Sequence, residues 1–271
     1  MHYMRKLSLL LAVVLASMAA GPQDELVRAR QLYNDKLYNL AIDSATAARH
    51  APELADTATL IIARCLLERF HSKESDTADL AAARTELQQI RPAGLMPSDQ
   101  VELIIALGQA LFYEDQPGGA AEEFEMALER VDPKNPNARE RVLDWWASAI
   151  DRQAALRPEA ERPPLYARII TRMEEELRRD TASAAASYWL VAAARGNGDL
   201  ERAWDVALAG WARASLTGDR RATLRADLDQ IVTQAIIPER ARMLAPVGGS
   251  AQAIATMRSE WDALKQAWSA Q

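Results

Sequence analysis

The sequence has 271 residues, enough for one long repeat domain or two compact ones. Its formal net charge of −6 excludes a general attraction to nucleic acid or to anionic membranes. Its single cysteine excludes an internal disulfide, so buried apolar helix faces must stabilise the fold. Cys65 lies in an apolar run and is expected to be a small core residue with an unreactive thiol.

The first twenty residues have the pattern of an export signal. Arg5 and Lys6 precede an uncharged apolar run, residues 7–20, which is shorter than the roughly 18–20 residues of a membrane-spanning helix. Small residues place the best cleavage site after Ala19. We therefore predict a signal peptide over 1–19 and a periplasmic or secreted mature protein without a membrane span. A lipid anchor is not indicated, because no cysteine lies near the cleavage site. The alternative to a cleaved signal peptide is an uncleaved membrane anchor.

The remaining chain predicts helices and no sheet. Alanine, leucine, glutamate, glutamine and arginine dominate, and these are strong helix formers. No segment alternates apolar and polar residues over a strand length with β-branched residues at the apolar positions. Proline and glycine breaks separate about a dozen expected helices. The breaks are Pro52, Pro92, Pro97, Pro117, Pro133, Pro136, Pro158, 163–164, 196–198, Gly218, Pro238 and 246–249.

Two helix starts have acidic capping candidates. Asp99, with Ser98, precedes the helix that runs into Val101, and Asp199 precedes a helix beginning at Leu200. The Asn-Gly pair just before Asp199 would suggest a β-hairpin between strands. Both of its flanks have helical period, so we predict a turn between two helices.

Three stretches of the chain resemble one another. Each has a first helix with small residues, a short turn, and a second helix whose small residue occupies an equivalent place. The stretches are LYNDKLYNLAI at 32–42 with Ala45 and Ala48; Leu107, Gly108 and Leu111 with Ala120, Phe124 and Ala127; and WLV at 189–191 with GDLERA at 198–203 and Ala207. Each resembles the tetratricopeptide repeat, in which two antiparallel helices pack through small residues at fixed offsets.

The resemblance implies a right-handed superhelical solenoid. The equivalent residues Ala41, Ala120 and Ala203 are too far apart for one repeat each, so further helix pairs are expected over 57–91 and 138–179. This predicts an all-α repeat domain over 20–214 with about five helix pairs, each longer than the standard repeat. A non-repetitive helical bundle is the alternative.

Residues 215–271 are predicted to form capping helices without this small-residue pairing. One face of the last helix carries Ile254, Met257, Trp261, Leu264 and Trp268 as a narrow apolar seam. A solenoid needs a terminal helix to close its last open face, which favours a cap. A seam that docks a second copy or another partner stays open as the alternative.

The residues offer little for catalysis. Only His50 and His71 remain after removal of the leader, and with one isolated cysteine no metal-ligand spacing exists. No nucleophile elbow or phosphate-binding glycine loop is present, and the acidic runs have the helical spacing of a solvated face. We therefore expect no catalytic, cofactor-binding or metal-binding residue. Trp145 and Trp146 point about 100° apart on a helix, so one is expected in the core.

The function that this pattern favours is an interaction scaffold that binds a peptide or protein partner in the cell envelope. In such solenoids the first helix of each pair lines the concave side, where arginines and tyrosines suit a groove that grips carboxylates or backbone carbonyls. The candidate residues are Arg30, Tyr33, Asn34, Arg64, Gln109, Phe112, Tyr113, Arg152, Tyr188 and Arg195.

Three alternatives remain for these residues and for the chain. Tetratricopeptide domains that clamp a C-terminal carboxylate use a lysine and asparagine set that this chain lacks, so that specificity does not carry over. The alternative to a binding role is that the candidate residues are ordinary solvated helix residues. Two alternatives to the scaffold function apply to the whole chain. It is a helical accessory or remnant domain of a periplasmic cell-wall enzyme, or it is a structural subunit of an envelope complex with no ligand of its own. The oligomeric state stays open.

Overall fold

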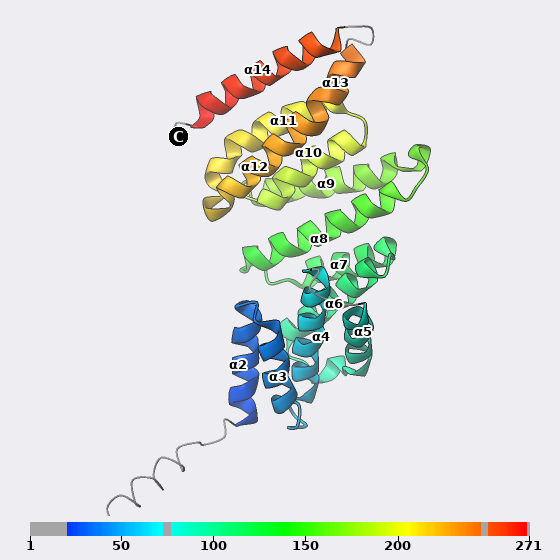
Figure 1. The fold of residues 1–271 in the computed structure, drawn as a ribbon, viewed down its shortest axis with the longest axis vertical. Coiled ribbons are helices and arrows are strands. Elements are labelled where there is room, and N and C mark those ends of the chain that lie inside the picture. Colours follow the sequence, from blue (N-terminus) through cyan, green and yellow to red (C-terminus); the bar gives the residue numbers. More distant parts are fainter. Residues whose placement is uncertain (1–20, 73–76, 245–248, 270–271) are drawn as a thin grey trace, which may run out of the picture. The chain divides into compact units, whose positions relative to one another are not determined.

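The computed structural model describes residues 21–72, 77–244 and 249–269, and within these ranges the protein is all-helical without a strand (Figure 1). The predicted signal peptide lies outside the described residues. Over the same ranges, no helix has both the length and the apolar character that a membrane crossing requires. The chain divides into two compact units, residues 1–110 and 111–271, and the division falls within helix α6.

In the first unit, helices that follow one another along the chain pack side by side. Helix α2 contacts α3, α3 contacts α4, and α4 contacts α5, while α2 also reaches α4. The elements are α2 (Pro22–Asn34), α3 (Tyr38–Ala48), α4 (Ala55–His71), α5 (Ala78–Gln89), the 3₁₀ turn η1 (Pro92–Gly94) and α6 (Pro97–Tyr113).

The second unit repeats this arrangement. Helix α7 contacts α8, α9 contacts α10, and α10 contacts α11. Alternate helices also meet, since α10 touches both α8 and α12. The α-helices are α7 (Pro117–Arg130), α8 (Pro136–Ala155), α9 (Pro163–Arg179), α10 (Ala184–Gly196), α11 (Leu200–Arg213), α12 (Arg221–Ile231), α13 (Ile237–Leu244) and α14 (Ser250–Ser269). Short turns between them are η2 (Glu159–Glu161), η3 (Ala214–Leu216), η4 (Gly218–Arg220) and the π-helical η5 (Val232–Ile236).

The small residues at equivalent places in the three similar stretches are buried. Ala41, Ala120 and Ala203 each have no exposed surface, and Gly108 is buried. On α10, a Cβ at Gly196 would clash with the ring of Tyr166 on α9, so only glycine allows these helices to approach. The further helix pairs expected over 57–91 and 138–179 are present as α4 with α5 and α8 with α9. Small residues therefore lie where neighbouring helices need close contact.

Prolines set many helix starts, because the missing N–H has no partner at the first helical position in any case. Five helices, α2 and α6 to α9, begin at a proline. Pro238 is different: the prediction of a helix break there is wrong. The five residues Val232–Ile236 form a π-helical turn, and the helix then continues as α13, in which Pro238 is the second residue. A proline ring inside a regular helix meets the carbonyl four residues earlier, and the wider turn accommodates it.

One capping prediction is confirmed and the other is not. The Asp199 side chain accepts a hydrogen bond from the backbone N–H of Arg202 at 3.0 Å, as an N-cap does. Gly198, with φ of +80°, forms the turn before it. Helix α6 instead begins at Pro97, which places Asp99 inside its first turn. There the carboxylate of Asp99 accepts hydrogen bonds from Arg30.

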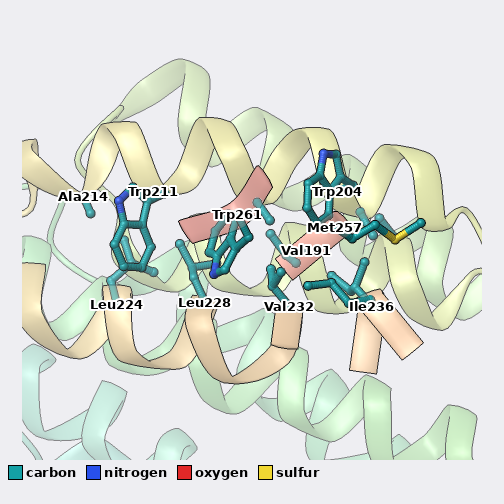
Figure 2. Packing of buried hydrophobic residues seen from close by; sticks show 14 residues of the cluster. Val191, Trp204, Trp211, Ala214, Leu224, Leu228, Val232, Ile236, Met257 and Trp261 are labelled. Atoms are coloured by element: carbon teal, nitrogen blue, oxygen red, sulfur yellow. The ribbon is translucent and has the colours of Figure 1, made fainter. Parts of the chain in front are cut away.

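The seam on α14 packs against its own chain. Trp261 is fully buried between Trp204 and Trp211 of α11, with ring centroids 6.0 and 5.3 Å away (Figure 2). Its indole N–H donates to Asp229 Oδ1 at 2.8 Å, and Met257 is buried beside it. Trp268, at the end of the seam, stays 40% exposed. Helix α14 therefore covers α11 and α12 as a cap does.

Two predictions about single core residues are confirmed. Cys65 has no exposed surface, and burial raises the pKa of its thiol to about 12, so it stays protonated. Trp146 is fully buried, whereas Trp145 is partly exposed and packs against Phe124 with a centroid distance of 5.7 Å.

Candidate functional site

The predicted arginines of the first unit are held by acidic residues of α6. Arg30 binds Asp99 in a two-pronged contact, with Nη1–Oδ1 at 3.1 Å and Nη2–Oδ2 at 2.9 Å. Arg64 forms an ion pair with Glu102 at 2.9 Å and lies over the ring of Tyr33, 4.3 Å from its centroid. These guanidinium groups are already matched by carboxylates within the chain.

The other candidates of the first unit do not form a shared surface with them. The Tyr33 hydroxyl donates to Glu68 Oε1 at 3.5 Å, and Asn34 is exposed at the end of α2. Gln109 is buried, with 7% of its surface exposed. Tyr33 and Arg64 are the candidates of this unit that the structure brings together.

Three candidates of the second unit join an aromatic cluster. Phe112 and Tyr113 pack edge-on against Trp145, with centroid distances of 5.4 and 5.8 Å. Arg152 lies 4.8 Å from the Phe112 centroid and forms an ion pair with Asp115. The cluster fixes the end of α6 against α8, and its arginine is again paired within the chain.

Arg195 is paired as well. Its Nε is 3.0 Å from Glu239 Oε2 and its Nη2 is 2.6 Å from Oε1, which ties α10 to α13. The hydrogen bond to Glu239 raises the pKa of Arg195 further. All four predicted arginines therefore bind carboxylates of their own unit.

Two candidates line hollows in the surface: Tyr188 lines both of those described next, and Arg195 lines the smaller one. A cleft of about 590 Å³ lies along α8, α10 and the start of α12. A second hollow of about 260 Å³ shares Tyr188 and Asp227 with it, and we call the two together the inner groove. Its lining is Asn137, Glu140, Arg141, Asp144, Ala184, Ala185, Tyr188, Arg195, Arg220, Thr223, Leu224, Asp227, Gln230, Ile231, Gln234 and Ala235.

A network around Glu140 fixes one end of the inner groove. The Glu140 carboxylate accepts hydrogen bonds from the Ser183 hydroxyl and, at 2.9 Å, from the backbone N–H of Ala185. It also forms an ion pair of 3.0 Å with Arg220. Because these partners come from the start of α10 and from η4, the network holds the walls of the groove in place.

Two further carboxylates, Asp144 and Asp227, line the inner groove. Asp144 of α8 accepts a hydrogen bond from the indole N–H of Trp189 at 2.8 Å. Asp227 of α12 has no hydrogen bond or ion pair with any residue that the structure describes. Burial and then the charge of Asp144 raise the pKa of Asp227. The two carboxylates therefore repel each other within the groove.

Tyr188 lies among these charges. Burial raises the pKa of its hydroxyl, and the carboxylates of Asp227, Asp151 and Asp144 raise it further. The ring is thus neutral at physiological pH and packs against Trp189 with a centroid distance of 5.3 Å. It offers the groove an apolar surface with a hydroxyl near the carboxylates of Asp144 and Asp227.

The π-helical turn forms the far end of the inner groove. Ala235 and Gln234 lie within the turn, and Gln230 and Ile231 lie in the helical residues just before it. Turns of this kind displace side chains from the regular helical register and occur often at functional sites. Gln234 of the turn and Gln230 of the preceding helix both line the smaller hollow.

Sequence reasoning missed the acidic half of this site. Asp144 precedes the small residue Ala147 by one helical turn, a spacing that could have placed it on the same inner face as Tyr188. Asp227 had no such signal, because α12 lacks the small-residue pattern on which the predicted repeats rest.

No protein-family model, curated protein or solved structure matches this chain. Among the residues that the structure describes, no three His, Cys, Asp or Glu side chains are arranged to hold a metal ion. The geometry of the inner groove is therefore the basis for a functional proposal.

Proposed function

We propose that the protein is an exported, non-catalytic binding module that holds an extended segment of a peptide or protein partner in the inner groove. In this proposal the helix pairs form a tetratricopeptide-like, right-handed superhelical solenoid, with α8, α10 and α12 as consecutive first helices. The observation that carries the proposal is the pair of hollows along those helices, which share Tyr188 and Asp227.

The lining of the inner groove suits a peptide backbone. The amide side chains of Asn137, Gln230 and Gln234 both donate and accept hydrogen bonds, as an extended main chain requires. Ile231 and the Tyr188 ring add apolar surface. The larger hollow, about 590 Å³, lies within the roughly 300–1,000 Å³ range of ligand sites.

Two other functions remain as alternatives to this one. The chain could be an accessory or remnant domain of a periplasmic cell-wall enzyme, or a structural subunit of an envelope complex without its own ligand. Both predict that no peptide binds in the inner groove, since neither uses the groove for peptides.

A variant that fills the groove tests the proposal. We would probe the purified chain with an array of acetylated hexapeptides and measure the affinity of bound sequences by fluorescence anisotropy. Ala185→Trp should weaken binding by roughly tenfold or more, because its side chain lines the hollow. Ala222→Trp is the matched control, on an exposed position of α12 outside the lining. Absence of peptide binding, or equal weakening by both variants, would reject the groove as a peptide site.

A further inference from the structure

We propose that the inner groove selects a cationic residue: a lysine or arginine side chain of the bound peptide inserts between Asp144 and Asp227, against the ring of Tyr188. This inference rests on the proposed peptide-binding function and names the chemistry of the peptide. It also reverses the sequence-based expectation that arginines of the protein grip carboxylates of a partner.

The cations that line the inner groove are already engaged. Arg220 forms its ion pair with Glu140, and Arg195 binds Glu239 through two nitrogens. Arg141, the remaining cation of the lining, takes part in an interaction within the chain. A partner carboxylate would have to displace one of these interactions, which costs part of what it gains.

Asp144 and Asp227, by contrast, form no ion pair with a described cation. Asp144 accepts a hydrogen bond from Trp189, whose indole is neutral. Asp227 has neither a hydrogen bond nor an ion pair among the described residues. Both acids line the larger hollow, and Asp227 also lines the smaller one, so two carboxylates without a cationic partner among the described residues lie along the same cleft. A cation placed there would interact with two carboxylates at once and remove their repulsion.

The ring of Tyr188 makes the proposed site more selective for a cationic side chain than a pair of carboxylates alone would be. It lines both hollows together with Asp227. A ring next to carboxylates binds ammonium and guanidinium groups through its electron-rich face, while its edge packs on the aliphatic stem of lysine or arginine. A negatively charged peptide would meet two like charges here, so the site discriminates by repulsion as well as attraction.

A bare metal ion fits the site less well than an organic cation. Calcium takes six to eight oxygen ligands and magnesium demands octahedral coordination. The described residues contain no group of three possible ligands, so the two carboxylates would leave most of the coordination sphere to water. A side chain that brings its own hydrogen-bond donors and apolar stem uses both the acids and the ring.

Three matched peptide pools test the inference. Each pool is a fluorescein-labelled, amidated hexapeptide mixture with Ala, Leu, Ser and Gln at five positions. The third position is arginine, its uncharged isostere citrulline, or glutamate. We expect the arginine pool to bind roughly tenfold or more tightly than the citrulline pool, since hydrogen bonds between charged groups are the strong ones. The glutamate pool should bind least, and added salt should narrow the difference.

Variants then locate the preference. The double change Asp144→Asn with Asp227→Asn keeps the shape of both side chains and should bring the arginine and citrulline pools to equal affinity. Asp205→Asn, an exposed acid of α11 outside the groove, should leave the preference intact. The circular dichroism spectra and melting curves of both variant proteins should match those of the wild type.

The outcomes separate this inference from the proposed function. Equal binding of the arginine and citrulline pools, or tighter binding of the glutamate pool, overturns the cationic preference while peptide binding stands. A preference that survives the double variant overturns the assignment to these two acids. Failure of every pool to bind, together with a negative peptide array, overturns both.

Discussion

Ion pairs between an arginine and a carboxylate connect neighbouring helices in both units, and the pair of Arg139 with Glu176 is deeply buried. Their side chains are 14% and 5% exposed. Arg139 Nε donates to Glu176 Oε2 at 2.8 Å, and its Nη1 donates to the carbonyl of Leu128 at 2.9 Å. One guanidinium therefore joins α7, α8 and α9. Burial alone would raise the pKa of Glu176, but the hydrogen bonds and charge of Arg139 lower it below the ordinary 4.5.

Replacement of this arginine should cost stability in a pH-dependent way. In the wild type, the lowered pKa contributes stability that is present above pH 4.5 and is lost as pH falls through the folded-state pKa. In Arg139→Met the buried carboxylate has lost its main partner, so its pKa should lie above the ordinary value and stability should fall as pH rises through it. At pH 7 we expect a loss of about 3–5 kcal/mol, and a smaller loss at pH 4.

Tryptophan fluorescence during urea unfolding measures this loss, because all seven tryptophans lie in the second unit. Arg152→Met is the matched control. Its pair with Asp115 is exposed, with side chains 40% and 74% accessible, so its removal should cost no more than about 1 kcal/mol at either pH. A loss for Arg139→Met that is equal at pH 4 and pH 7 would mean that the charge of Glu176 is not the cause.

At the scale of elements, most helix boundaries are predictable because their chemistry is local. A proline at the first helical position or a turn glycine such as Gly198 acts on its own few residues. The continuation of the helix through Pro238 is not predictable in this way, because it depends on a π turn stabilised by packing. Val232 and Ile236 of that turn are both fully buried in the cluster of Figure 2.

The candidate site was harder to predict than the helices for a related reason. Periodicity places a side chain on a face of its helix but does not name its partner. Arg30 meets an acid 69 positions away and Arg195 one 44 positions away, distances at which sequence patterns carry no pairing information. The inner face was therefore partly predictable, through Tyr188, whereas the charge that remains in the inner groove was not.

The position of α14 gives a prediction at this same scale. Trp261→Ala should lower the free energy of unfolding by about 3–5 kcal/mol, since it removes a fully buried ring from between two others. Trp268→Ala, on the same helix and 40% exposed, should change it by no more than about 0.5 kcal/mol. Urea unfolding monitored by circular dichroism compares the two. Equal, small effects would mean that α14 is not a cap in solution and would reopen the docking role of its seam.

At the scale of the whole molecule, the fold is compatible with an oxidising compartment outside the cytoplasm. The second unit closes its core with α14, and the one thiol is buried and held protonated, so no exposed cysteine is available for unwanted oxidation. Helix α2 begins at Pro22, with Gly21 as its N-cap. Cleavage after Ala19 would therefore leave every described helix intact. The proposed export signal and the described helices therefore use different residues of the chain.

Export itself is the last prediction. Expressed in a Gram-negative host, the full chain should be recovered from the periplasmic fraction with Ala20 or Gly21 at its N-terminus, as mass spectrometry of the intact protein would show. Leu10→Arg places a charge in the apolar run and should leave the uncleaved chain in the cytoplasm, because signal peptides require an uninterrupted apolar segment. Val27→Arg is the control: it adds the same charge at a side chain 57% exposed on α2 and should not change export. Wild-type protein found in the cytoplasm with Met1 or Met4 intact would reject export, and the search for partners of the inner groove would move to cytoplasmic peptides.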